Sequence, residues 1–598
     1  MLPQDSHSDH TVSLPPESPL SGGDSSPTPP TTSPSLSLGS LTRGGRWDPF
    51  WVAGVAGIGL IALIMRLWRL GQFAAPVFDE VYFPKFAENY LDGVAFFDVH
   101  PPLGKYLISV GILIFGRTEI GYRIMPALFG ALMPVLVAIV AYQLSRWRLF
   151  SLVAGGLMLT DGLFLVESRY GLMNVFLVVF GFVAQIFLFE GLAAAGKRRA
   201  FLLTLSGLML GASISVKWNG LWFGVMFALI GLMIWGMAGY WRRFLVGSLT
   251  MLLGSGVAAI ARLNGWEPVA SQTGLLLSPG WFGLAAVLAL LALWVLNCPG
   301  WWAQGLPRMG LLAEIAGLQW WHYLGCYAAM AFVFYVIQWI PHLFQNPQAG
   351  IPLALDAELL PNLAKSFVAI NRSVLSGHTI STLEVTDGQS VHPYCSTSLQ
   401  GLATGIPALQ GLLSHKIWAA GAWSWPVLGR PVGYYFSAEG GPWRGVHALG
   451  NPILWWLSIG SVLYLSGRGL RQFQGIPAYV LLGFAGNYVP WFIVSRCVFI
   501  YHHMSALAFS IMALAWVIST LLVSEAQLWR RVGLGLIAAV IACQLFFLPI
   551  WYGLPLTSSG FYQRMWFRPN PMPILCFDAQ SCTTTPLRIP AIPGLNWI

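Results

Sequence analysis

Residues Phe78–Lys105 read FDEVYFPKFAENYLDGVAFFDVHPPLGK and follow the first long apolar segment, Trp51–Leu70. This stretch gathers acidic, basic and aromatic side chains, although only 9% of the 598 residues are charged. The adjacent acids Asp79 and Glu80 stand where the apolar segment ends, and carboxylates there make a poor surface against lipid. The stretch therefore predicts a polar site at a membrane boundary. The alternative is a solvated loop with no chemistry of its own.

The composition predicts an all-α polytopic membrane protein. Soluble domains carry about 25% charged residues, whereas this chain is 56% hydrophobic with a mean hydropathy of +0.65. Apolar runs of about 20 residues recur along it, as in membrane-spanning helices. Backbone groups in lipid need internal partners, and long unbroken runs favour helices over a barrel. The net charge of +9 comes from short basic clusters between apolar runs, a pattern that does not indicate nucleic-acid binding.

The apolar runs predict about thirteen spans. They lie near Trp51–Leu70, Ile120–Leu144, Leu149–Val166, Leu172–Ala193, Phe201–Val216, Leu221–Ala238, Phe244–Ile260, Trp281–Leu296, Trp321–Ile340, Pro452–Leu465, Ala478–Val494, Met504–Val523 and Val532–Pro549. The run Tyr106–Phe115 is too short to cross and is expected to be re-entrant or interfacial.

The charge clusters give these spans an orientation. With the N-terminus in the cytoplasm, every basic cluster between spans falls on the inner side, as the positive-inside rule expects. These clusters are Arg146/Arg148, Lys197/Arg198/Arg199, Arg242/Arg243, Arg308, Arg468/Arg471 and Arg530/Arg531. The acid pair then lies on the outer side of a multi-pass protein of the cell membrane, so the catalytic face is expected to be extracytoplasmic.

The same pattern divides the chain. We expect a disordered cytoplasmic tail at 1–46, an N-terminal transmembrane catalytic region at 47–341 with its first external loop at 71–119, an extracytoplasmic loop at 342–451, a C-terminal four-helix region at 452–549 and an extracytoplasmic tail at 550–598. The large loop shows no repeat or strand pattern that names a fold.

The seven cysteines show no metal-ligand spacing. Cysteines in or beside apolar runs are expected to be ordinary packing residues: Cys298, Cys326, Cys497 and Cys543. Cys576 and Cys582 lie close together in the tail, where a disulfide and two free thiols are both compatible with an extracytoplasmic position.

Asp79 and Glu80 can supply a general base and a group that orients it. Cations at the outer ends of predicted spans suit a phosphate, because ionisable groups there are costly and are candidates for function. They are Arg123, Arg169, Lys217 and Arg496. The alternative for each is a side chain that extends to the lipid headgroups.

Three further residues are candidates for binding the lipid phosphate or sugar, or for organising loops: His100, Lys105 and His392. His502 and His503 share the loop of Arg496, but no third ligand at metal spacing is evident, so no metal is predicted.

Several blocks together resemble the protein O-mannosyltransferases. These are DE at Asp79–Glu80 with FFDVHPPLGK at Phe96–Lys105, YRIMPALFGAL at Tyr122–Leu132, ESRYGLMN at Glu167–Asn174, SVKWNG at Ser215–Gly220, HPYCS at His392–Ser396, WSWPVLGRPVGYYF at Trp423–Phe436 and FIYHHMSALAF at Phe499–Phe509. The resemblance extends over about 51–549 and is closest to the bacterial branch. It departs from the eukaryotic members, whose large loop carries a β-trefoil module with no counterpart here.

The resemblance implies a GT-C glycosyltransferase architecture, about 11–13 transmembrane helices here with one large extracytoplasmic loop. It implies inverting transfer of mannose from a polyprenyl-phosphate-mannose donor to Ser or Thr hydroxyls of secreted or membrane proteins, without a cofactor. Asp79 would be the base, Glu80 its support, and Arg123 and Lys217 the cations for the departing phosphate. The alternatives are another GT-C transferase acting on lipid or polysaccharide, and a secondary transporter; the sequence predicts no oligomeric state.

Overall fold

In the computed structural model, the described residues are 48–240, 306–348, 350–379, 421–438, 441–469, 474–494 and 497–567, with short segments at 385–386, 389–390, 395–396, 572–573, 588–589 and 597. The predicted spans near 244–260 and 281–296, the predicted tail at 1–46, and the cysteines Cys298, Cys576 and Cys582 lie outside this description.

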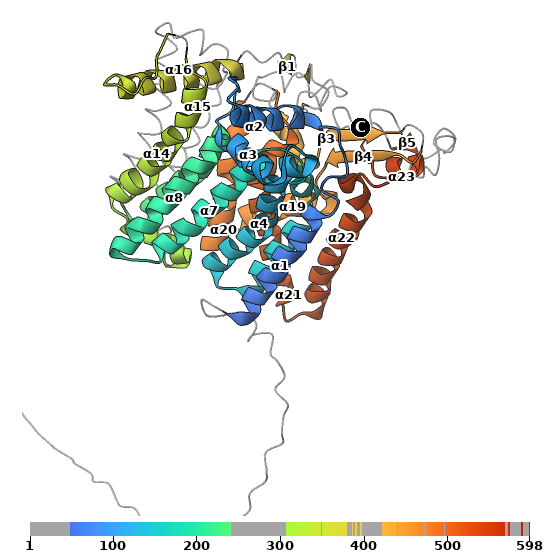
Figure 1. Ribbon diagram of the computed structural model, residues 1–598. Coiled ribbons are helices and arrows are strands. Elements are labelled where there is room, and N and C mark those ends of the chain that lie inside the picture. The colour runs from blue at the N-terminus through green and yellow to red at the C-terminus, as the bar shows by residue number, and fades with distance from the viewer. Residues whose placement is uncertain are drawn as a thin grey trace, which may run out of the picture.

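Long helices run side by side through the body of the molecule (Figure 1). Within the described residues, eight helical runs are long and apolar enough to cross a membrane. They are α1 (Pro49–Leu67), α4 (Glu119–Ser145), α7 (Asn174–Leu192), α8 (Gly196–Val216), η3 with α9 (Trp218–Met237), the run η5–α14–α15 (His322–Gln345), η9 with α21 (Ile500–Leu522) and α22 (Gln527–Tyr552).

Other predicted spans form shorter or broken helices. The predicted continuous span Leu149–Val166 is instead two helices, α5 (Arg148–Leu159) and α6 (Gly162–Glu167). The break has a local cause, because the Asp161 carboxylate accepts a hydrogen bond from the Phe164 amide at 2.8 Å and so starts a new helix. The spans predicted near 452 and 478 correspond to α19 (Pro452–Gly469) and to α20 (Gly475–Tyr488) with η8 (Val489–Ile493).

Short elements gather at the end of the bundle where α2 and α16 lie (Figure 1). They include η2 (Phe78–Val81), α2 (Phe83–Asp92), α3 (Leu103–Phe115), α16 (Leu359–Thr379), η7 (Gly421–Val427) and α23 (Ser558–Tyr562). Segment η4 (Leu306–Gly317) precedes the η5–α14–α15 run, in which η5 is His322–Ala329, α14 is Met330–Ile337 and α15 is Trp339–Gln345. The predicted short run Tyr106–Phe115 lies within α3, which has 13 residues.

The large loop contains an antiparallel hairpin that the sequence did not reveal. Strand β3 (Val432–Ser437) pairs with β4 (Arg444–Ala448), and the register shifts between Gly433 and Tyr435. Two-residue strands form two further, separate antiparallel pairs. These are β1 (Val385–Thr386) with β2 (Gln389–Ser390), and β5 (Met572–Pro573) with β6 (Arg588–Ile589).

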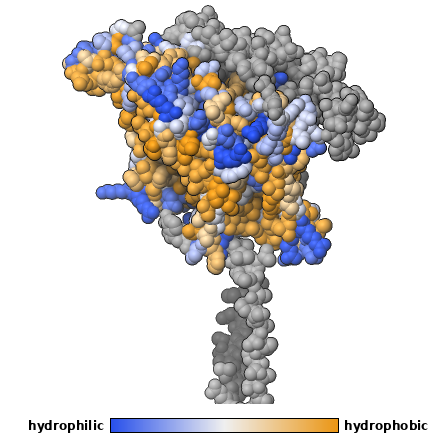
Figure 2. Space-filling model, turned by 45° about the vertical axis from the view of Figure 1, so that its right-hand side comes forward, coloured by the Kyte–Doolittle hydropathy of each residue, from blue (hydrophilic) through white to orange (hydrophobic). Residues whose placement is uncertain are grey.

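The surface of the bundle is that of a multi-pass membrane protein. On the face shown in Figure 2, apolar side chains form a broad band across the helical body, and hydrophilic side chains lie toward its two ends. Helices α7 and α21 are mostly buried, whereas α1 and α22 present apolar side chains to the surroundings. So large an exposed apolar surface is unfavourable in water, so we infer that lipid surrounds this part of the protein.

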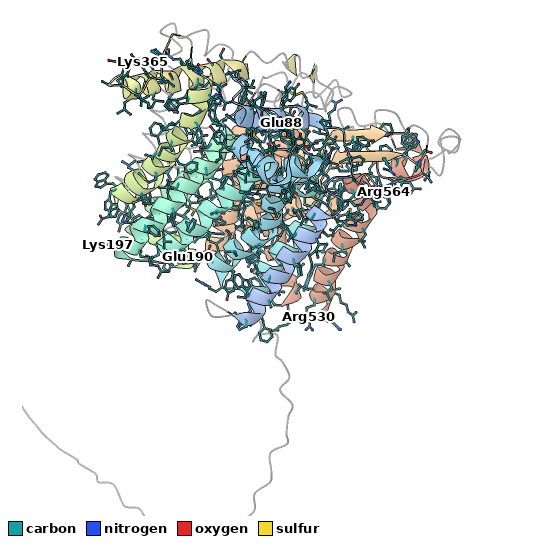
Figure 3. All side chains as sticks on the ribbon, viewed as in Figure 1. Glu88, Glu190, Lys197, Lys365, Arg530 and Arg564 are labelled. Carbon is teal, nitrogen blue, oxygen red and sulfur yellow. A yellow bond between two sulfur atoms is a disulfide. The ribbon has the colours of Figure 1, made fainter. Side chains whose placement is uncertain are left out.

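Charged side chains mark the two ends of the bundle. Lys197, Glu190 and Arg530 lie at one end, and Glu88 and Lys365 lie at the other (Figure 3). The predicted inner clusters at Lys197 and Arg530 therefore share an end. We refer to the end with Glu88, which also carries η2, as the outer end.

One cysteine prediction is wrong. Cys497 is not a simple packing residue, because it forms a disulfide with Cys395 in the large loop. Cys326 and Cys543 are free and buried, as expected of packing residues. The pairing was missed because its two cysteines are separated by 102 positions, and connectivity cannot be deduced from sequence alone.

Candidate active site

Asp79 and Glu80 lie on η2, a single turn that follows the loop after α1. Glu80 is buried and its carboxylate accepts hydrogen bonds from two backbone amides, Val77 N at 3.1 Å and Gly171 N at 2.8 Å. The first bond closes the turn, and the second ties it to the segment after α6. The turn is thereby fixed at the outer end of the bundle.

Arg123 on α4 completes the environment of Glu80. Its Nε lies 2.7 Å from Glu80 Oε1 and its Nη2 lies 2.8 Å from Oε2, a bidentate ion pair with both side chains buried. Its Nη1 donates to the carbonyl oxygens of Phe73 at 2.8 Å and Leu70 at 3.3 Å. The Tyr170 ring stands 4.9 Å from the guanidinium carbon.

The contacts of Arg123 favour a role other than the predicted one. We predicted a cation for the departing phosphate, but the guanidinium is engaged by Glu80, by two loop carbonyls and by an aromatic face. These contacts hold the turn that carries Asp79, so we propose a positioning role for Arg123. Glu80 contacts the backbone of the same turn, and its expected role as the support of Asp79 stays a prediction.

Asp79 has a different environment from its neighbour. Its side chain is half-buried, and burial raises its pKa above the usual aspartate value. The charge of Lys217 opposes that rise, and Asp98 adds to it. A half-buried carboxylate with a raised pKa suits a general base.

Lys217 stands at the end of α8, where the backbone turns into η3. It is buried, with its Nζ 5.3 Å from the centre of the Tyr501 ring and 5.8 Å from that of Phe83. It interacts electrostatically with Asp79 and with Glu167. Of the predicted cations, Lys217 is the one whose charge acts on Asp79, so we propose it as the cation of the site.

Two other predicted cations are engaged elsewhere. Arg169 Nη1 donates to the carbonyl oxygens of Arg66 at 2.9 Å and Trp68 at 2.7 Å, so it caps the end of α1. Lys105 Nζ pairs with the Asp98 carboxylate and donates to the His100 carbonyl at 2.8 Å. Their contacts favour structural roles over phosphate binding.

Of the remaining predicted site residues, the structure describes His100 but not His392 or Arg496. The His100 ring lies 6.0 Å from the Phe83 ring, centre to centre, at the edge of the same region. His392 and Arg496 lie outside the described residues and stay predictions. No group of three His, Cys, Asp or Glu side chains in the described part of the chain is placed to hold a metal ion.

The structure adds residues that the sequence analysis did not select. Glu167 at the end of α6 is fully buried; its carboxylate accepts hydrogen bonds from Tyr434 Oη on β3 and from Asn174 Nδ2 on α7, the latter at 2.9 Å. A buried acid in the block ESRYGLMN was the available signal. Tyr434 gave none, because its contacts depend on where the large loop folds back.

The fold and site define a polytopic membrane protein with an acid–cation site at one end of its helical bundle. The profile described as "Dolichyl-phosphate-mannose-protein mannosyltransferase" matches residues 57–118 and 112–259, and that described as "C-terminal four TMM region of protein-O-mannosyltransferase" matches residues 408–569. The chain belongs to the protein O-mannosyltransferase family.

Named relatives match nearly the whole chain. The polyprenol-phosphate-mannose–protein mannosyltransferase of Corynebacterium glutamicum is 24% identical over 575 residues, covering 85% of this chain and 92% of the relative. That of Mycobacterium tuberculosis is 25% identical over 554 residues, covering 85% and 90%. The solved protein O-mannosyltransferase complex of S. cerevisiae bound to the sugar donor shares the fold, with a TM-score of 0.55 and 18% identity over 90% of this chain and 94% of that one.

Proposed function

We propose that this protein transfers mannose from polyprenyl-phosphate-mannose to Ser or Thr hydroxyls of secreted or membrane proteins. The observation that carries the proposal is the half-buried Asp79 carboxylate beside Lys217 at the outer end of the bundle. The matches to bacterial polyprenol-phosphate-mannose–protein mannosyltransferases over most of both chains support the choice of donor and acceptor.

The reaction is an inverting displacement at the anomeric carbon. Asp79 takes the proton of the acceptor hydroxyl as its oxygen bonds to that carbon, on the face opposite the phosphate. The carbon–phosphate oxygen bond breaks, and the electron pair leaves on polyprenyl phosphate. Lys217, the cation that acts on Asp79, supplies the positive charge that stabilises the growing charge on that phosphate. Positioning and electrostatic stabilisation supply most of the rate, because phosphate is already a good leaving group.

The supporting residues act through the backbone. Arg123 and Glu80 fix the turn, Arg169 fixes the end of α1, and Lys105 fixes the Asp98–His100 segment. His100, His392 and Arg496 stay candidates for contacts to the donor.

We propose that the protein lies in the cell membrane with its N-terminus in the cytoplasm. Its outer end then faces away from the cytoplasm. Basic clusters at Lys197 and Arg530 occupy the opposite end (Figure 3) and support this orientation through the positive-inside rule. The Cys395–Cys497 disulfide supports it independently, since disulfides persist in oxidising compartments.

The test is an incubation of purified protein in lipid nanodiscs with radiolabelled polyprenyl-phosphate-mannose and a Ser/Thr-rich peptide. Label should pass to the peptide, and a matched peptide with Ala at each Ser and Thr should receive none. Label found only in a lipid or polysaccharide acceptor would replace the acceptor class. No label on the peptide, together with movement of unreacted donor across the bilayer of sealed liposomes that contain the protein, would indicate a transporter and overturn the proposal.

A further inference from the structure

Tyr434 occupies an irregular position in the β3–β4 hairpin. Gly433 pairs with His447 and Tyr435 pairs with Val446, so Tyr434 is the extra residue of a β-bulge. A bulge redirects the side chain it carries, and bulges are frequent beside active sites. Here Tyr434 is buried, whereas the next residue, Tyr435, is half-buried.

The ring of Tyr434 stacks on Phe78, the residue directly before Asp79. The ring centres are 5.2 Å apart and the planes differ by 8°. Phe78 has a φ of +48°, in the left-handed region that a bulky side chain rarely adopts. Such a conformation persists only where the surroundings enforce it, and the stacked ring is the contact that covers Phe78 from the large loop.

The hydroxyl of Tyr434 is anchored at a second point. It donates a hydrogen bond to Glu167 Oε1, and Asn174 Nδ2 holds the other carboxylate oxygen at 2.9 Å. Glu167 is fully buried and interacts electrostatically with Asp79 and Lys217. The tyrosine therefore connects the hairpin of the large loop to α6 and α7 on one side and to the Asp79 turn on the other.

We propose that Tyr434 is a positioning residue that fixes the Asp79 carboxylate, with its ring holding Phe78 in the left-handed conformation and its hydroxyl held by Glu167. If Phe78 relaxed to an ordinary conformation, the backbone of η2 would turn and carry Asp79 away from Lys217. The consequence for activity rests on the proposed mannosyl transfer. It makes the folded hairpin a requirement for a competent base.

The activity test compares Tyr434→Phe with Tyr434→Leu, measuring kcat and the KM for donor separately. Tyr434→Phe keeps the ring and loses the hydrogen bond to the buried Glu167 carboxyl group, so kcat should fall about tenfold. Tyr434→Leu loses both contacts, and kcat should fall about a hundredfold. The donor KM should change less than about twofold, because the base acts in the transition state.

Tyr435→Phe is the matched control, since the ring of this neighbouring tyrosine packs on Phe73, with ring centres 4.4 Å apart. It should keep the wild-type kcat. Wild-type kcat in folded Tyr434→Phe and Tyr434→Leu, or a loss confined to KM, would overturn the proposal. Should Tyr434→Leu fail to fold, the nearly isosteric Tyr434→Phe still decides the hydroxyl's role.

A readout without activity separates this proposal from the proposed function. The melting temperatures of the wild type, Phe78→Leu, Tyr434→Leu and the double variant form a double-mutant cycle, which measures the coupling between the two side chains. The fall in melting temperature of the double variant should be smaller than the sum of the two single falls. Additive falls would contradict the proposed positioning of Phe78 by Tyr434. If the wild type transfers no mannose but the variants show this coupling, only the proposed function is refuted. If the wild type is active but the falls in melting temperature are additive, only the positioning role of Tyr434 is refuted.

Discussion

Arg123 holds Glu80 by two hydrogen bonds, at 2.7 and 2.8 Å, in a buried ion pair, whereas the adjacent Asp79 remains half-buried. Two neighbouring carboxylates thus have different tasks. We propose that Glu80, whose two carboxylate oxygens both accept hydrogen bonds, fixes the backbone, and that Asp79, beside Lys217, takes the proton. This division leads to separate expectations for the two acids.

Breaking the buried pair should destabilise the protein. We expect Glu80→Gln or Arg123→Ala to lower the free energy of unfolding by about 3–5 kcal/mol, because each leaves an uncompensated buried group. Thermal unfolding in nanodiscs measures this. The exposed Arg117–Asp92 pair is the control, and Asp92→Ala should barely change the melting temperature. A stable Arg123→Ala whose only defect is a raised donor KM would restore the phosphate role.

Replacing the base should remove activity without removing the fold. Asp79→Asn should lower mannosyl transfer by about 10²–10⁴-fold, the usual contribution of a positioned base. Its melting temperature should not fall, since burial already disfavours the charged carboxylate. Asp92→Asn, at an exposed carboxylate on α2, should transfer mannose normally. Full transfer by Asp79→Asn would exclude this residue as the base.

The sequence was sufficient where a single residue type carries the information. Asp79 and Lys217 could be selected as candidates because charge is rare in this chain, and the apolar runs predicted α1, α4 and α7. The break before α6 was available in the sequence too, because Asp161 followed by Gly162 is a helix-start signal. It was missed because the apolar run continues through it.

Partner choice could not be predicted. Arg123 and Glu80 are 43 positions apart, and Tyr434 and Glu167 are 267 positions apart. Only the folded chain shows which cation an acid takes. Arg169 illustrates the same limit, since a cation at a span end satisfies backbone carbonyls as readily as it binds a phosphate.

Removing the charge of Lys217 should move the pH dependence of transfer. Asp79 must be ionised to accept a proton, so activity falls as the pH drops through its pKa. Burial raises that pKa and Lys217 opposes the rise. Lys217→Gln removes the opposing charge, so the acid limb of kcat/KM should shift to higher pH.

Lys217→Arg keeps the charge, and its acid limb should stay near that of the wild type. The profiles are measured with the radiolabel assay across the acidic and neutral range. An acid limb that stays in place or moves to lower pH in Lys217→Gln would show that Lys217 does not act on the base.

The Cys395–Cys497 disulfide should stabilise the outer end and support activity. It closes a separation of 102 residues, for which removal typically costs about 2–5 kcal/mol. Ser396 N donates to the Val498 carbonyl at 2.8 Å beside it, and Tyr501, whose ring faces Lys217, follows shortly along the chain. We therefore expect Cys395→Ser with Cys497→Ser to lower both the melting temperature and mannosyl transfer.

Cys326→Ala, at a free buried cysteine, is the control for loss of a thiol and should keep the disulfide-dependent activity. Thiol labelling of the native wild type, denatured without reductant, should leave both paired cysteines unmodified; labelling of both would refute the pairing.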